Sequence, residues 1–247
     1  MSIVHKTGGL SGFVTRLGRQ SSRSDDEPSR VADASRVTEA SRVAVEPRTV
    51  AAASAETVYA SKTLARFLDL LFARPNDAEV MDLGPVIGSN ITFLGERVGC
   101  KIHVEDLYGD IDRHVLHEKL DELPEFLTGR LAVPPSSIDA VLGWDIFDYL
   151  APMAATALAS ELMRILRPGG VFLGFFGARA SDDPRYTKFL IEDETHLRLR
   201  SYPSACTRRW VLQNRDINIM FAGLEICETV LLKSGVREIL FRKRILS

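Results

Sequence analysis

The residues with the clearest chemical potential surround a glycine turn. An acid, Asp82, ends an apolar run, and two glycines, Gly84 and Gly88, follow it closely. Glycine accepts backbone angles closed to other residues and lets a ligand approach the main chain. Glu105 lies 21 positions after Gly84, near the roughly 20-residue spacing at which an acid meets a bound ribose. This spacing predicts a nucleoside-binding pocket.

The elements that must position these residues form one strand–turn–helix–strand unit. We predict strands over residues 80–83 and 101–104, joined by the glycine turn and a helix over 89–98. Two short apolar runs separated by a helix are typical of neighbouring parallel strands. Glu105 and Asp106 both follow the second strand, and alternation sends their side chains to opposite sides. Glu105 has the better spacing for the ribose, and Asp106 is the second candidate.

The run 82–88, Asp-Leu-Gly-Pro-Val-Ile-Gly, resembles the first motif of class I S-adenosylmethionine-dependent methyltransferases. The resemblance implies S-adenosylmethionine as the cofactor, with Asp82 and the glycine loop at its methionine end and Glu105 at its ribose. Dinucleotide dehydrogenases usually lack an acid two residues before their glycines. The family's middle glycine falls on Val86, which we expect to be extended, with its side chain turned toward the sheet or helix.

The run 138–145 resembles the strand after which the family places the transferred methyl group. Asp145 and Tyr149 are therefore candidates to line the acceptor side. Trp144 is a candidate to flank the adenine or the sulfonium, because aromatic faces attract cations; the alternative is a core tryptophan. Asp145, Tyr149 and His196 are the candidate catalytic bases, which the reaction needs only if the acceptor is protonated.

The remaining segments predict one α/β domain. Its sheet would be Rossmann-like, doubly wound and seven-stranded, mostly parallel with a C-terminal antiparallel hairpin around Ser234-Gly235. The turn at 166–170, Leu-Arg-Pro-Gly-Gly, also resembles the family. Residues 127–130 depart from it, because they stand where the family usually has an acid that binds the adenine amino group. Predicted helices cover 56–73, 111–120, 152–166 and 214–224, and further strands cover 125–133, 171–176, 227–233 and 236–242.

The polar segment 177–209 has no clear periodicity. Loops at this end of an α/β sheet often determine substrate specificity. Four arginines here are candidates to bind a carboxylate or phosphate, or else belong to solvated surface: Arg198, Arg200, Arg208 and Arg209.

The chain divides near residue 54. Residues 1–53 contain few large apolar side chains, a composition that cannot offset the entropy of ordering, so we predict a disordered tail before a domain at 54–247. The first 24 residues carry basic side chains and no acid. The alternative there is a short amphipathic helix that contacts a partner or a membrane surface.

Composition narrows the class of protein. The 247 residues carry a net charge of −2, which counts against a nucleic-acid substrate. The three cysteines are widely separated and predict neither disulfides nor a zinc site, and His114 with His117 alone does not make a metal site. No apolar run has the length of a membrane span, and the N-terminus lacks a secretory signal, so we expect a cytoplasmic protein.

The resemblance implies S-adenosylmethionine-dependent methyl transfer, and the negative net charge favours a small-molecule acceptor over nucleic acid. The alternative is a non-catalytic binding protein of the same fold with a degenerate cofactor loop, which Val86 and the missing adenine acid favour. A nicotinamide oxidoreductase is the third hypothesis, and Asp82 and the terminal hairpin argue against it.

A shortened protein that starts at Glu56 should fold as the full chain does, because the tail lacks periodic apolar positions. We expect its melting temperature to lie within a few degrees of that of the full chain in calorimetry. A loss of more than about 2 kcal/mol, the contribution of one buried side chain, would show that the tail packs on the domain.

Overall fold

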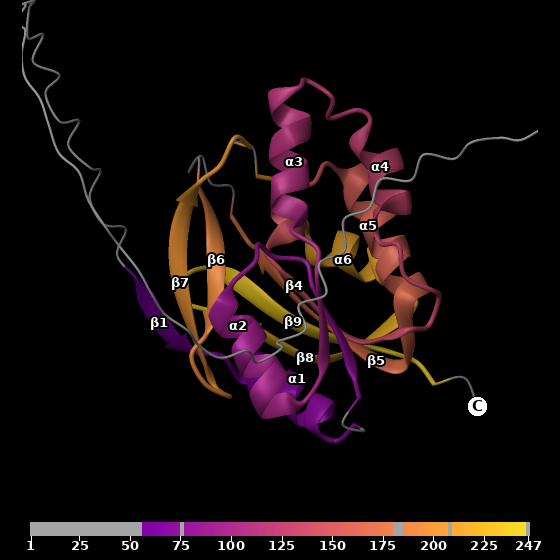
Figure 1. Ribbon diagram of the computed structural model, residues 1–247. Coiled ribbons are helices and arrows are strands. Elements are labelled where there is room, and N and C mark those ends of the chain that lie inside the picture. The colour runs from indigo at the N-terminus through magenta and orange to yellow at the C-terminus, as the bar shows by residue number, and fades with distance from the viewer. Residues whose placement is uncertain (1–55, 75–76, 180–184, 207–208, 246–247) are drawn as a thin grey trace, which may run out of the picture. The chain divides into compact units, whose positions relative to one another are not determined.

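The computed structural model describes residues 56–74, 77–179, 185–206 and 209–245 (Figure 1). The chain divides into two units, Met1–Val50 and Ala51–Ser247. The predicted disordered tail, with its basic N-terminus, lies outside the described residues.

A six-stranded sheet with strand order β3-β2-β4-β5-β9-β8 forms the centre of this unit. β3, β2, β4 and β5 run parallel, and β9 is antiparallel to both β5 and β8. The predicted Rossmann-like sheet with a terminal antiparallel hairpin is confirmed. The strands are β2 (Glu79–Asp82), β3 (Lys101–Val104), β4 (Ile138–Trp144), β5 (Leu166–Gly177), β8 (Leu224–Leu231) and β9 (Val236–Lys243).

The prediction of a seventh strand over 125–133 is not confirmed. Residues Leu123–Arg130 form helix α4 instead. Pro124 occupies the first turn, where its fixed φ favours a helix start. Leu123 and Leu127 are four apart, and a helix lets both bury on one face.

Helices cover both faces of this sheet. The buried strand residues alternate between the two faces, so that Val141 and Phe172 join one core cluster while Ala140 and Leu173 join the other. Figure 1 shows α3, α4, α5 and α6 on one side and α1 and α2 on the other. The helices are α1 (Lys62–Phe72), α2 (Gly88–Thr92), α3 (Leu107–Leu116), α5 (Pro152–Ile165) and α6 (Asn214–Met220), with the π-helical turn η1 (Phe93–Val98) and the 3-10 turn η2 (Ile146–Tyr149).

A second sheet of three antiparallel strands was not predicted. Its order is β1-β7-β6, from β1 (Thr57–Ala60), β6 (Arg185–Ile191) and β7 (His196–Pro203). The predicted helix over 56–73 therefore begins only at Lys62, after Ser61, whose side chain caps it by accepting a hydrogen bond from the backbone N–H of Leu64. No helix among the described residues is long and apolar enough to cross a membrane.

Asn90 joins the two sheets. It lies in α2, directly after the glycine turn, and is 1% exposed. Its Nδ2 donates to the carbonyl of Phe189 at 2.9 Å, and its Oδ1 accepts from the N–H of Ile191 at 2.8 Å. Both partners belong to β6, so one side chain fixes this strand beside the turn.

Replacing Asn90 with Ala should destabilise the fold, because two buried backbone groups of β6 would lose their partners. We expect a loss of about 2–4 kcal/mol in the free energy of unfolding, measured by denaturant titration. Ser89→Ala is the matched control, since Ser89 is the exposed neighbour in the same helix. Equal stability of the two variants would contradict the assigned role of Asn90.

Candidate functional site

The strand order of the larger sheet reverses at β2. β3 follows on one side of β2 and β4 on the other. Open α/β sheets bind ligands in the crevice outside the carboxyl ends of their strands at such a switch point. Asp82 ends β2 and Trp144 ends β4, so these two residues stand at that position.

The side chain of Trp144 fills the switch point. Its indole Nε1 donates to Oδ1 of Asp82 at 2.6 Å, and the ring stacks on Phe189 with centroids 5.2 Å apart and planes 5° from parallel. Trp144 is only 2% exposed and has a left-handed backbone with φ +48°. A Cβ placed on Gly84 would lie 2.8 Å from Cδ1 of this indole. The space above the first glycine therefore holds a tryptophan.

Asp82 is engaged within the protein. The carboxylate is buried, and the same Oδ1 also accepts a hydrogen bond from the N–H of Gly84 at 2.8 Å. Burial raises the pKa of Asp82 to about 6, while the hydrogen bonds from Gly84 and Trp144 oppose that rise.

The two acids after β3 also have protein partners. Glu105 forms an ion pair with Arg130, whose Nε donates to Asp110 at 2.7 Å. Asp106 caps α3 and accepts from the N–H of Gly109 at 3.1 Å. Each of these contacts uses one oxygen of its carboxylate, Oε2 of Glu105 and Oδ1 of Asp106.

Val86, in the middle of the glycine turn, does not pack as expected. The Val86 side chain is 65% exposed, so the expected packing against sheet or helix is wrong. Buried Pro85 and the Trp144 indole at Gly84 already occupy the inner side of the turn. A Cβ on Gly88 would meet nothing within 4 Å. Of the two glycines in this turn, only Gly88 has open space beside it.

These residues do not fit a nucleoside cofactor in this arrangement. Such a cofactor needs open space above the glycine turn and a free acid for its ribose. The Trp144 indole occupies the space above Gly84, and Arg130 forms an ion pair with one oxygen of Glu105.

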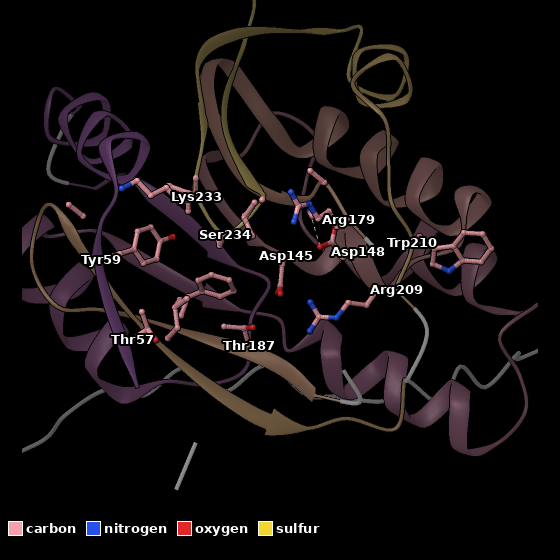
Figure 2. A pocket seen from close by; sticks show the side chains of 18 residues that line it. Thr57, Tyr59, Asp145, Asp148, Arg179, Thr187, Arg209, Trp210, Lys233 and Ser234 are labelled. Carbon is pink, nitrogen blue, oxygen red and sulfur yellow. Dashed lines mark hydrogen bonds between the residues drawn. The ribbon is translucent and has the colours of Figure 1, made fainter. Parts of the chain in front are cut away.

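A cavity of about 580 Å³ lies beside the switch point (Figure 2). Strands β1 and β6 form one wall, and the residues that follow β4 and β5 form another. The turn between β8 and β9 and the segment before α6 complete it. Its lining includes the side chains of Tyr59, Asp145, Asp148, Phe189 and Arg209.

Two buried carboxylates line this cavity. Asp145 Oδ1 accepts a hydrogen bond from the hydroxyl of Tyr108 at 2.5 Å. Both oxygens of Asp148 accept from the N–H of Gly177, at 3.1 and 3.0 Å. Burial raises the pKa of Asp145 to about 6. Burial, followed by the nearby charge of Asp145, raises the pKa of Asp148 to about 8.

The candidate bases lie in different places. Asp145 lines the cavity. Tyr149 lies behind it, with its ring 4.9 Å from the guanidinium carbon of Arg209 and 5.5 Å from the ring of Tyr108. His196 pairs with Ala60 across β7 and β1, contacts Asp193 at 3.1 Å, and is not among the cavity residues.

Asp148 was missed by the sequence prediction. Its spacing of three from Asp145 places it in the 3-10 turn η2, which returns its carboxylate to the same cavity. Among the four arginines, Arg209 lines the cavity, whereas Arg198 and Arg200 form ion pairs with Glu56. Arg208 lies outside the described residues. Within the described ranges, no group of three or more His, Cys, Asp or Glu could hold a metal ion.

Comparison with known proteins identifies similar folds. No family model and no curated protein matches the sequence. Similar solved structures include methyltransferases, some of them S-adenosylmethionine-dependent. The 1,6-didemethyltoxoflavin-N1-methyltransferase of Burkholderia thailandensis, with bound S-adenosylhomocysteine, is 14% identical with a TM-score of 0.44, over 74% of this chain and 79% of its own.

Two further structures show the same level of similarity. The CcbJ methyltransferase of Streptomyces caelestis is 15% identical with a TM-score of 0.44, over 73% of this chain and 94% of its own. The PH0226 protein of Pyrococcus horikoshii is 15% identical with a TM-score of 0.42, over 68% and 82%. Because these TM-scores lie below 0.5, the fold assignment rests on the strand order and the terminal hairpin.

Gly84→Ala should destabilise the protein, because its Cβ would collide with the buried indole of Trp144. We expect a loss of about 1–3 kcal/mol, the cost of overpacking a core, measured by denaturant unfolding. Gly88→Ala is the matched control and should change stability by less than about 0.5 kcal/mol, since that site is open. A harmless Gly84→Ala would show that the indole does not fill the turn.

Proposed function

We propose that this chain is a small-molecule-binding protein of methyltransferase-like fold, with its ligand in the cavity beside Asp145 and no nucleoside cofactor at the switch point. One observation carries the proposal: the Trp144 indole occupies the space above Gly84, and a separate cavity lies next to it.

The cavity has the features of a ligand site. Its volume of about 580 Å³ falls within the range of small-molecule pockets, roughly 300–1,000 Å³. Apolar side chains such as Phe189 and Leu199 alternate on its walls with a few polar groups, including Asp145 and Thr187. Such a lining holds an organic molecule and orients it through a small number of hydrogen bonds.

Methyl transfer is disfavoured on geometric grounds. In-line transfer requires the donor and the acceptor to be held together at near-attack distance. The residues expected to hold the donor, Asp82 and Glu105, are engaged by Trp144 and Arg130. The cavity would then bind one ligand, and no site would remain for a methyl donor beside it.

S-adenosylmethionine-dependent methyl transfer to a small-molecule acceptor is the second candidate. The observation that favours it is the placement of Asp82 and Glu105 after adjacent strands, with open space at Gly88. It requires the indole of Trp144 to leave the switch point. The residues proposed to hold the cofactor would then be Asp82, Gly84, Gly88, Glu105, Asp106 and Trp144, and Asp145, Tyr149 or His196 would serve the acceptor.

The wild-type protein should give no binding heat with S-adenosylmethionine or S-adenosylhomocysteine at millimolar concentration, because the indole closes the site. Trp144→Ala removes the indole and should allow at least weak binding. Trp210→Ala, which removes the other tryptophan, is the control and should bind neither. Saturable binding of either compound to the wild-type protein in calorimetry would favour the second candidate.

A further inference from the structure

We infer that the cavity binds an organic cation, a small amine with an aromatic or aliphatic body, whose charged end lies against Asp145 and Asp148. The inference rests on the proposed function, since it requires the cavity to be a ligand site. It adds the chemical class of the ligand.

Asp145 presents an unused acceptor to the cavity. The residue is 6% exposed, and Tyr108 holds its Oδ1 in place. The backbone N–H of Asp145 itself also donates to this carboxylate, which keeps further acceptor capacity on the side of the cavity. Figure 2 shows this carboxylate pointing into the cavity between Tyr59 and Arg209. An ionised carboxylate only accepts hydrogen bonds, so its missing partner is a donor.

The neighbouring arginines do not neutralise the two acids by direct contact. Neither Asp145 nor Asp148 forms an ion pair with a described residue. Arg237 donates to the carbonyls of Gly177 and Leu212, at 2.9 and 2.6 Å. Arg209 donates to the carbonyl of Arg185 at 2.5 Å and lies over the ring of Tyr149.

The walls suit the body of such a ligand. Tyr59 and Phe189 line the cavity with aromatic surface, which attracts both apolar groups and cations. An anion would have to lie beside the buried carboxylate of Asp145 and would keep the carboxyl group of Asp148 protonated. Arg179 and Lys233, the other cations of the lining, are exposed, where water weakens their attraction. The lining therefore favours a cation over an anion.

Proton release provides an independent signature. The charged groups that influence Asp148 are Asp145, Arg209 and Arg237, and the hydroxyls of Tyr108 and Tyr149 lie in the same cluster. The pKa of Asp148, raised to about 8, leaves it largely protonated at pH 7. A bound cation favours the ionised form, so binding should expel a proton and strengthen as pH rises toward 8. An anion would show the opposite trend.

The test is calorimetric titration of the full chain with three compounds of similar size: 2-phenylethylamine, 2-phenylethanol and 3-phenylpropanoate. We expect the amine to bind about tenfold or more tightly than the alcohol, the contribution of one charge-assisted hydrogen bond. The propanoate should not bind. Between about pH 6.5 and pH 8.5, the affinity for the amine should increase by about tenfold.

Matched variants assign the effect to the cavity. Asp145→Asn should lose the preference for the amine over the alcohol, and Asp148→Asn should lose the pH dependence. Asp121→Asn, which changes an exposed acid, is the control and should change neither. Thermal melting of each variant verifies folding, and both variants should fold because Asn keeps a side-chain oxygen that can accept the hydrogen bond from Tyr108 or Gly177.

The outcomes separate the two proposals. Binding of the propanoate alone, or of the alcohol as tightly as the amine, would overturn the cation inference and leave a small-molecule site in place. Failure of all three compounds at 10 mM would also overturn the inference. Binding of S-adenosylhomocysteine in the same series would overturn the proposed function instead.

Discussion

The Trp144 indole, packed against Gly84, fills the switch point of the larger sheet. The indole lies where the strand order reverses, donates to the buried carboxylate of Asp82 and stacks on Phe189. Phe189 reaches it because Asn90 holds β6 in place beside the glycine turn. Three segments distant in the sequence thus meet around one ring. The glycine, which in similar turns lets a ligand approach the backbone, here makes room for a side chain.

Because of this packing, the open cavity lies beside the switch point and not at it. The switch point between β2 and β4 is filled, and the cavity lies instead where β4 and β5 end and β1 and β6 cover them. The two buried acids on its wall are costly to keep ionised without a partner, which is why burial raises the pKa of both.

Local patterns in the sequence predicted much of the fold. The apolar runs that became β2, β3, β4 and β5 are short and bounded by turn residues, and Ser234-Gly235 predicted the hairpin of β8 and β9. The segment around Leu123 and Leu127 was misread, because a short apolar run fits either a strand or a helix face. The hairpin of β6 and β7 was not predicted, since its polar side chains hide the alternation.

The candidate site was harder to predict because its properties depend on long-range contacts. The sequence cannot distinguish a Trp144 that contacts a ligand from a Trp144 that belongs to the core. The stacking of its ring on Phe189 makes that distinction. Glu105 has the spacing of a ribose ligand, yet it forms an ion pair with Arg130, a residue of α4. The role of each predicted cofactor residue in binding remains a prediction.

The solvent accessibility of Trp144 shows whether its indole keeps the switch point closed. In a Trp210→Phe protein, Trp144 is the only remaining tryptophan, so its fluorescence reports on the switch point alone. With the indole buried at 2% exposure, acrylamide should quench it weakly, and millimolar S-adenosylhomocysteine should change neither the quenching nor the emission maximum. A saturable change in either signal on adding that compound would show that the indole leaves the switch point when the cofactor binds, so that the switch point is not permanently closed.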